Sequence, residues 1–424
     1  MPLRGVSPPS GLGYNQKSST SCGRAERSRS PSVKQPFIIS SETRKRCRVQ
    51  PATIEALDHF ATVNLEHYHL LYGSPLLDFS LYLRNGQEIL EFMQTHEFSR
   101  SILDQLAETM RGYYDNTDIL VHKGDLARLE RCLNVVRRGY YKQALEAHPS
   151  LKSKIAPLLA SLGEISQGIV GGGISEGLVT NATITAQRLV ANLGDPADAI
   201  LKATKLVQLA PVLYDHAALV AVVAPAIATL PQAPSIEIKD LADLALSGLF
   251  HDIGRTVMPT AIVRLPTRDY PTEYEEPKTH TTDGFDVLCN AINQGVMLPE
   301  TIAQVVLEHH ERFGGGGYPR GRQGRAEDDP LDGIQTFVRI VGIADTYVSL
   351  IMPRPGQPSL SPQGALATMR QSETDFDPDY FRPFQKMIQA KAAALFSATN
   401  DGSKGASKGK ILIIDEGRVA KIQK

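Results

Sequence analysis

Three features of the 424-residue sequence predict a mainly α-helical protein. Apolar residues recur at helical spacing from about Lys152 onward, a pattern typical of amphipathic or buried helices. Strand-like runs are concentrated in residues 51–140. The first 50 residues are rich in Ser, Pro, Gly and Arg, with ten basic and two acidic side chains. Such a segment cannot bury enough apolar surface to offset its ordering entropy, so we expect a disordered tail before the folded part.

These patterns divide the chain into five segments. We expect a disordered basic tail over residues 1–50, a small α/β regulatory module over 51–140 and a helical linker over 141–200. An all-helical bundle should follow over 201–396, and a flexible C-terminal tail over 397–424.

The small α/β module has a ββαβα pattern. Asp78–Leu83 and Glu88–Met93 are β-prone runs, and the Asn85-Gly86 pair between them is a strong hairpin signal. We expect a helix, a third strand and a second helix to follow, over 101–113, 118–122 and 126–136.

The helical part begins near Lys152. The pattern predicts helices within 152–232, interrupted by a glycine loop at 171–173, and then over 241–250, 303–311, 337–350 and 380–397. A short strand is expected at Ile411–Asp415.

Composition excludes several classes of protein. The longest apolar run, Ala217–Leu230, is shorter than the roughly 18 residues that a bilayer span requires, and it contains Pro225. The N-terminus lacks a signal-like apolar stretch, and the four cysteines fit neither a disulfide framework nor a CxxC metal site. We therefore expect a cytoplasmic protein with no membrane span. The basic tail contains no interleaved aromatic residues, so a solvated tail is favoured over a nucleic-acid contact.

Histidines carry the chemical signal. Five of the eleven lie between residues 216 and 310, and the first four of these are spaced by 35, 29 and 29 residues. They are His216, His251, His280, His309 and His310. Each of the first four is on or beside a predicted helix, as expected where successive helices contribute one ligand each to a common centre.

The His251-Asp252 pair ends an apolar helix. A single imidazole–carboxylate pair is more often a cap or a hydrogen-bonded core feature, but the other histidines favour a divalent cation here. His309 and His310 point about 100° apart on a helix, so both reach one centre only near the helix end. Asp345 follows a largely apolar run, where an unpartnered carboxylate would be costly. We expect Asp215 to lie at a helix start, which acidic side chains favour.

Five stretches together resemble the HD-GYP family, a branch of the HD-domain metal phosphohydrolases. They are His216, LFHDIGR at 249–255, HTTDGFDVL at 280–288, HHERFGGGGYPRG at 309–321 and RIVGIADTYVSL at 339–350. The resemblance covers about a third of the chain, residues 205–350. An HD pair alone is a weak signal, whereas this ordered series is highly specific.

The resemblance implies a centre of two divalent metal ions, usually iron or manganese. Carried over by position, one metal would be held by His216, His251, Asp252 and Asp345. The other would be held by Asp252 as a bridge, His280, His309 and His310. Two such cations clamp a phosphodiester and lower the pKa of water, so no separate Ser or Cys nucleophile is required.

The resemblance also implies a GYP loop, Gly317-Tyr318-Pro319, beside the metals. Tyr318 would stack on or hydrogen-bond a guanine, although a flexible loop is the alternative for the glycine run. Three positions depart from the family pattern. Arg255 stands where the family usually has a lysine after the HD pair. Gly314 and Val348 stand where it usually has two acidic residues. Val212 stands where some members of the family have an additional glutamate, and its absence favours two metals over three.

The implied function is metal-assisted hydrolysis of cyclic di-GMP to pGpG or GMP, with catalytic roles for Asp252 and Arg255 and substrate contacts from Arg255 and the GYP loop. Two alternatives stay open. One is an impaired module that binds cyclic di-GMP or a GGDEF diguanylate cyclase through the GYP loop, and the other is a phosphohydrolase for another nucleotide. The resemblance leaves a homodimer open.

Overall fold

The computed structural model describes residues 48–63, 78–85, 87–93, 117–209, 215–257, 278–352, 359–397, 413–415 and 418–420. The predicted helix over 101–113 and the departure at Val212 lie outside these residues, as does the tail up to residue 47.

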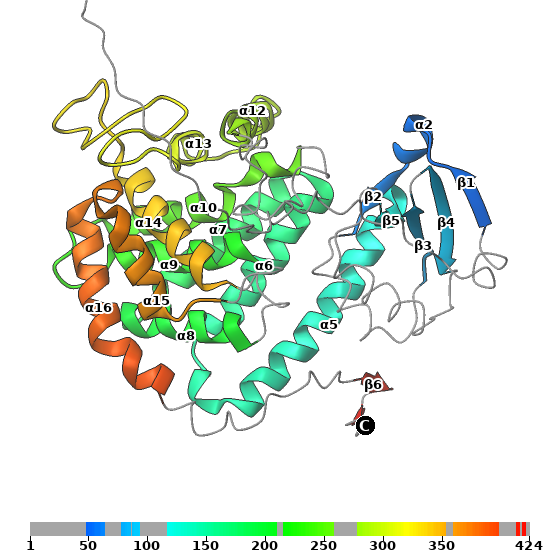
Figure 1. The fold of residues 1–424 in the computed structure, drawn as a ribbon, viewed down its shortest axis with the longest axis horizontal. Helices are drawn as coiled ribbons and strands as arrows, with labels where there is room; N and C mark the ends of the chain where they lie inside the picture. Colours follow the sequence, from blue (N-terminus) through cyan, green and yellow to red (C-terminus); the bar gives the residue numbers. More distant parts are fainter. Residues whose placement is uncertain are drawn as a thin grey trace, which may run out of the picture.

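A five-stranded antiparallel sheet lies at one side of the molecule (Figure 1). Its strands, in the spatial order β1-β4-β3-β5-β2, are β1 (Arg48–Pro51), β2 (Phe60–Thr62), β3 (Leu81–Asn85), β4 (Glu88–Met93) and β5 (Thr117–His122), and the short helix α2 (Ile54–Leu57) joins β1 to β2. The predicted hairpin is confirmed, because β3 and β4 pair with Asn85 opposite Glu88. The sequence pattern did not predict β1 or β2. All four residues of β1 are exposed and β2 has three residues, so neither shows a clear alternation.

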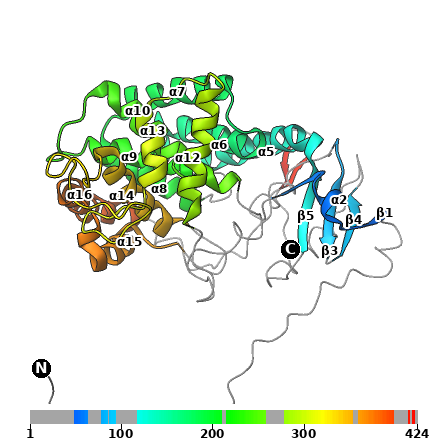
Figure 2. The same cartoon turned by 90° about the horizontal axis from the view of Figure 1, so that it is seen from above.

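The helix α5 (Leu126–Ala147) runs from the sheet to the bundle, as Figures 1 and 2 both show. It follows β5 through a 3₁₀ turn, η1 (Lys123–Asp125), and is followed by a second turn, η2 (Pro149–Leu151). The predicted module therefore passes into the predicted linker within one continuous helix.

From Ile155 to Ser397 the described residues form a helical bundle, which confirms the predicted fold class. Its helices are α6 (Ile155–Gly172), α7 (Glu176–Ala191), α8 (Pro196–Leu209), α9 (His216–Ala228), α10 (Ile238–Phe250), α12 (Thr279–Asn293), α13 (Glu300–Glu308), α14 (Thr336–Ile351), α15 (Pro362–Met369) and α16 (Pro378–Ser397), with 3₁₀ turns η4 (Ile253–Thr256) and η5 (Arg370–Asp375). The predicted glycine loop ends α6, where Gly173 adopts a φ of 75°. Near the C-terminus, β6 (Ile413–Asp415) pairs with β7 (Arg418–Ala420).

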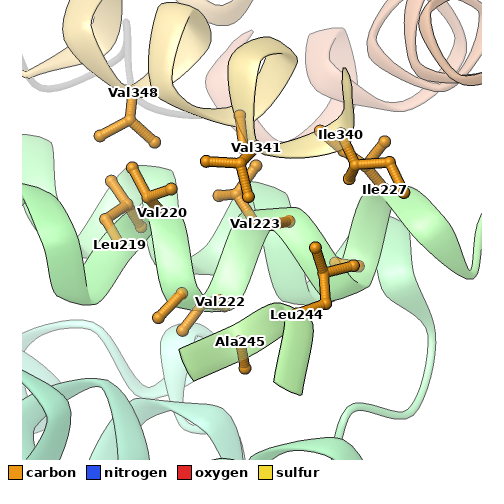
Figure 3. Packing of buried hydrophobic residues seen from close by; sticks show 14 of the residues in the cluster. Leu219, Val220, Val222, Val223, Ile227, Leu244, Ala245, Ile340, Val341 and Val348 are labelled. Atoms are coloured by element: carbon orange, nitrogen blue, oxygen red, sulfur yellow. The ribbon is translucent and has the colours of Figure 1, made fainter. Parts of the chain in front are cut away.

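The apolar helix α9 forms the centre of the bundle. All of its residues after His216 are buried, and it packs against α6, α8, α10 and α14. Figure 3 shows Val220, Val223 and Ile227 beneath Val341 and Ile340 of α14. This burial explains the apolar run that the sequence shows. None of the described helices combines the length and apolar character that a bilayer span requires.

Close helix crossings align the elements that carry the histidines. A Cβ at Gly248 of α10 would lie 2.9 Å from the backbone nitrogen of Ala221 in α9. A Cβ at Gly254 of η4 would lie 1.9 Å from the carbonyl oxygen of His280 in α12. These glycines permit close backbone contacts of α10 with α9 and of η4 with α12.

Candidate metal centre

Helix ends carry six of the seven proposed ligands, and the middle of α14 carries Asp345. His216 begins α9, and His251 follows the last residue of α10. His280 is in the first turn of α12, His309 follows the last residue of α13, and Asp345 is on α14. Because α9 and α12 begin and α10 and α13 end at this point, their terminal residues meet the middle of α14 at one place.

The seven ligands form two clusters of potential metal-binding atoms. Within each cluster the ligand atoms lie within 4.8 Å of one another: Asp252, His280, His309 and His310 form the first, and His216, His251 and Asp345 form the second. The clusters adjoin, because His251 Nε2 is 3.6 Å from Asp252 Oδ2 and 3.8 Å from Asp345 Oδ1. The structure thus places Asp252 between the two groups of histidines.

Backbone carbonyls orient two of the imidazoles. His251 Nδ1 is 2.8 Å from the carbonyl oxygen of Gly248, and His309 Nδ1 is 3.0 Å from that of Val306. A carbonyl can only accept, so each Nδ1 donates its proton and Nε2 is the ring nitrogen that faces the centre. This second hydrogen bond is the arrangement that fixes metal-ligating histidines.

The nitrogens that face the centre are close to one another. His280 Nε2 lies 3.3 Å from His309 Nε2 and 3.1 Å from His310 Nε2, and His216 Nε2 lies 3.3 Å from His251 Nε2. The Oδ1 atom of Asp252 is buried without a hydrogen-bond partner, 3.5 Å from His280 Nε2. An unsatisfied buried carboxylate oxygen among imidazole lone pairs fits a divalent cation with nitrogen and oxygen ligands.

Burial and the neighbouring charges set the protonation states needed for metal binding. Burial lowers the pKa of His251 to about 4 and that of His310 well below its usual range, which keeps both rings neutral. Burial alone would raise the pKa of Asp252, but Arg255 and the surrounding histidines hold it well below its usual range. Burial is likewise outweighed at Asp345, whose pKa is lowered by the hydrogen bond from His216. Neutral imidazoles and ionised carboxylates are the forms that bind metals.

The GYP loop lies against the cluster of Asp252, His280, His309 and His310. The Tyr318 ring stacks on His310 with 4.7 Å between ring centroids, and its backbone N–H donates to the His310 carbonyl oxygen at 3.3 Å. A Cβ at Gly317 would lie 2.5 Å from that same oxygen, so glycine is required for the close turn. Pro319 follows Tyr318 through a cis peptide bond.

Two glutamates to which the sequence pattern gave no role anchor this loop. The carboxylate of Glu308 is fully buried, 3.0 Å from Arg320 Nη1 and 3.2 Å from Arg322 Nε. Glu311 accepts hydrogen bonds from the backbone N–H groups of Arg320 and Gly321, at 2.6 and 3.1 Å. The signal was available, because both acids flank the His309-His310 pair and precede an arginine-rich loop.

Each described departure from the family pattern has a local structural context. Arg255 Nε lies 2.8 Å from Asp252 Oδ2, so the guanidinium pairs with a proposed ligand. A Cβ at Gly314 would lie 2.8 Å from the carbonyl oxygen of Thr374 in η5, which leaves no room for a side chain. Val348 is fully buried on α14, facing Leu219 and Val220 of α9 in Figure 3.

A cavity of about 230 Å³ adjoins the ligands. His310 and Asp345 line it together with Arg312, Thr346 and Asp375, so it combines proposed metal ligands with a cationic side chain and a hydroxyl group. Arg312 in turn pairs with Asp375 at 2.9 Å.

Comparisons with known proteins agree with this geometry. The family model described as an HD domain matches residues 203–380. Among curated proteins, the 3′3′-cGAMP-specific phosphodiesterase 1 of Vibrio cholerae is 36% identical over 127 residues, covering 30% of this chain and 27% of that protein. A cyclic di-GMP phosphodiesterase of Thermotoga maritima is 34% identical over 115 residues, covering 27% of this chain and 28% of that protein. This chain therefore matches only about a quarter of the length of these relatives.

Among solved structures, the HDG"Y"P protein Bd1817 of Bdellovibrio bacteriovorus aligns with 78% of this chain and 99% of its own, at 14% identity and a TM-score of 0.42. That likeness is too weak to add to the sequence matches. The ordered histidine and aspartate series, the GYP loop and the family match lead to one assignment. Residues 203–380 form an HD domain, and the ordered motif series together with the curated relatives supports the HD-GYP branch of this family.

Proposed function

We propose that the protein is a metal-dependent phosphodiesterase that hydrolyses cyclic di-GMP to pGpG or GMP. The observation that carries this proposal is the placement of Asp252 between two clusters of ligand atoms, with its Oδ1 atom unpartnered. Relatives named as phosphodiesterases of cyclic di-GMP and of 3′3′-cGAMP support a cyclic dinucleotide as the substrate class.

The ligand set favours two divalent cations, iron or manganese. The first cation would be held by His216, His251, Asp252 and Asp345, and the second by Asp252, His280, His309 and His310. Mixed imidazole and carboxylate ligands suit both elements. When bound, such a pair supplies Lewis-acid polarisation of a phosphodiester and lowers the pKa of water.

The chain's own residues supply orientation and charge. Asp252 stays ionised and is directed toward both clusters, while Arg255 adds a positive charge at the edge of the site, where it would attract a substrate phosphate. The Tyr318 ring, already stacked on His310, offers a flat surface for a guanine base. Gly317 permits the close turn that places this ring against His310.

Metal content and turnover together test the proposal. Protein reconstituted with Mn²⁺ or Fe²⁺ should bind two equivalents per chain and cleave cyclic di-GMP. Asp252→Ala should lose both cations and all turnover. Asp286→Ala, the same substitution at an exposed position of α12, should lose neither. A two-metal preparation that leaves cyclic di-GMP, 3′3′-cGAMP and cyclic di-AMP uncut would refute the activity.

A second candidate is a binding module that retains the metals without catalysis. It is favoured by Arg255, whose guanidinium pairs with Asp252 at the position where the family has a lysine that can release a proton. Such a module would bind cyclic di-GMP or a GGDEF-domain partner through the GYP loop. Calorimetric binding of cyclic di-GMP with no product over the same period would select this candidate over the enzyme.

A further inference from the structure

A helix outside the family match contacts the residue that precedes the first proposed ligand. Asp215 lies immediately before His216, and its Oδ1 atom accepts the backbone N–H of Ala217 at 2.9 Å, which caps α9. This confirms the expected helix-start role. The same carboxylate accepts two hydrogen bonds from α6: Ser166 Oγ donates to Oδ1 at 2.8 Å, and Gln167 Nε2 donates to Oδ2 at 2.8 Å.

The hydrogen bonds between Asp215 and α6 are partly buried and use both carboxylate oxygens. Ser166 is 6% exposed, so its hydroxyl group has little access to competing water. Both carboxylate oxygens of Asp215 are engaged, and hydrogen bonds to an ionised acceptor are among the stronger ones in proteins. The start of α9 is thereby fixed against α6 by side-chain contacts as well as by packing.

The fixed carboxylate determines where the next side chain lies. His216 Nε2 reaches Asp345 Oδ1 at 2.9 Å and His251 Nε2 at 3.3 Å. His216 is bonded directly to Asp215 in the chain, so a shift of Asp215 moves the imidazole relative to two partners on other helices. Metal sites tolerate ligand displacements of about 0.2 Å.

We propose that Asp215, held by Ser166 and Gln167, is a positioning residue that fixes His216 in the metal centre. The proposal rests on the proposed two-metal centre and extends it to α6, which begins at Ile155, well before the matched residues 203–380. The helix α6 is in turn tied to α5 by Arg138, which forms two hydrogen bonds with Glu164 at 2.8 and 2.7 Å. The metal centre therefore depends on an element joined to the N-terminal sheet through α5 (Figure 1).

Titration of the metal-free full chain with Mn²⁺, monitored by calorimetry, tests this proposal through metal affinity and does not depend on enzymatic turnover. Asp215→Ala should raise the dissociation constant of one Mn²⁺ by about tenfold, the scale seen when residues supporting metal ligands are removed. The affinity for the other Mn²⁺ should be unchanged. The double variant Ser166→Ala/Gln167→Met keeps the helix cap and should show the same selective loss, which keeps the test valid if Asp215→Ala fails to fold.

Two controls separate positioning from helix capping. Asp215→Asn should bind Mn²⁺ like the natural protein, because the amide keeps its Oδ1 acceptor and can donate to a rotated Gln167 side chain. Ser175→Ala removes the cap of α7, where Ser175 Oγ accepts from the N–H of Leu178 at 3.3 Å, and it should leave both affinities unchanged.

Wild-type affinities in both Asp215→Ala and the double variant would overturn the proposal, as would an equal loss in Ser175→Ala. An Asp215→Asn variant as weak as Asp215→Ala would overturn the hydrogen-bond mechanism. A natural protein that binds fewer than two Mn²⁺ would overturn the proposed centre itself, and this inference with it.

Discussion

Replacing Gly254 with alanine should damage one half of the metal centre and spare the other. Gly254 lies in η4, two residues after Asp252, where the backbone of η4 touches the first turn of α12. A Cβ atom there would lie 1.9 Å from the carbonyl oxygen of His280 and 2.6 Å from the backbone nitrogen of Gly284. Both obstacles are backbone atoms, so a side-chain rotation cannot relieve the contact.

The required displacement follows from these distances. Real Cβ atoms essentially never approach other atoms closer than 3.0 Å, so α12 must shift by about 1.1 Å to clear the contact at 1.9 Å. The shift carries His280 away from Asp252 Oδ1, now 3.5 Å from His280 Nε2. It exceeds by several times the roughly 0.2 Å that metal–ligand distances tolerate. The cluster of His216, His251 and Asp345 contains no residue of α12 and should keep its geometry.

Mn²⁺ titration and unfolding of the metal-free chain measure both effects. Gly254→Ala should bind one Mn²⁺ at least about tenfold more weakly, which is the effect expected when the support of a metal ligand is removed. Overpacking should also lower the free energy of unfolding by about 1–3 kcal/mol. Gly177→Ala is the matched control, because a Cβ at this position in α7 has nothing within 4 Å and should stabilise the helix by up to about 1 kcal/mol. Two Mn²⁺ bound with natural affinity in Gly254→Ala would refute the reasoning.

Three further predictions concern protonation, a buried ion pair and the loop. His251 is fully buried with a pKa of about 4, below its unfolded value near 6.5, so the unfolded chain takes up the proton first. The metal-free protein should therefore lose on the order of 3 kcal/mol as the pH falls from about 6.5 to 4, and urea unfolding with no change over that range would contradict this. Arg339→Met leaves Asp377 buried without its main ionic partner and should cost about 3–5 kcal/mol in urea unfolding. Arg138→Met, which removes an exposed pair, should cost less than about 1 kcal/mol, and equal losses would argue against the buried pair. Glu308→Gln weakens the attachment of Arg320 and Arg322, so trypsin should cut the loop faster than in Glu300→Gln, where an exposed acid of α13 is changed; equal cleavage rates would count against this anchor.

The ligand series could be predicted because its signal is chemical. Histidines and aspartates beside apolar helices stand out in the sequence even when many residues separate them. The structure brings all seven proposed ligands into two adjoining clusters. The hairpin of β3 and β4 was predictable for a similar reason, because the Asn-Gly pair in the sequence is a local signal.

Long-range contacts were not predictable in the same way. Nothing in the sequence near Ser166 or Gln167 indicates that α6 contacts Asp215, since the three residues become neighbours only after the bundle packs. The strands β1 and β2 could not be predicted either, because their own sequences show no clear alternation of apolar and polar residues. They are short, and β1 is exposed throughout, so their pairing depends on neighbouring strands rather than on their own pattern.

The three described departures from the family pattern differ in what they change at the proposed metal centre. At Gly314 a side chain is excluded by Thr374 of η5, and Val348 packs into the apolar contact between α14 and α9. Both changes are absorbed by packing, and the proposed ligands still converge. Arg255 differs, because its guanidinium pairs with Asp252, the carboxylate placed between the two clusters. An arginine keeps the positive charge but cannot readily release a proton. The choice between a turning-over enzyme and a binding module therefore rests on Arg255, and Arg255→Lys is the substitution whose effect on turnover separates them.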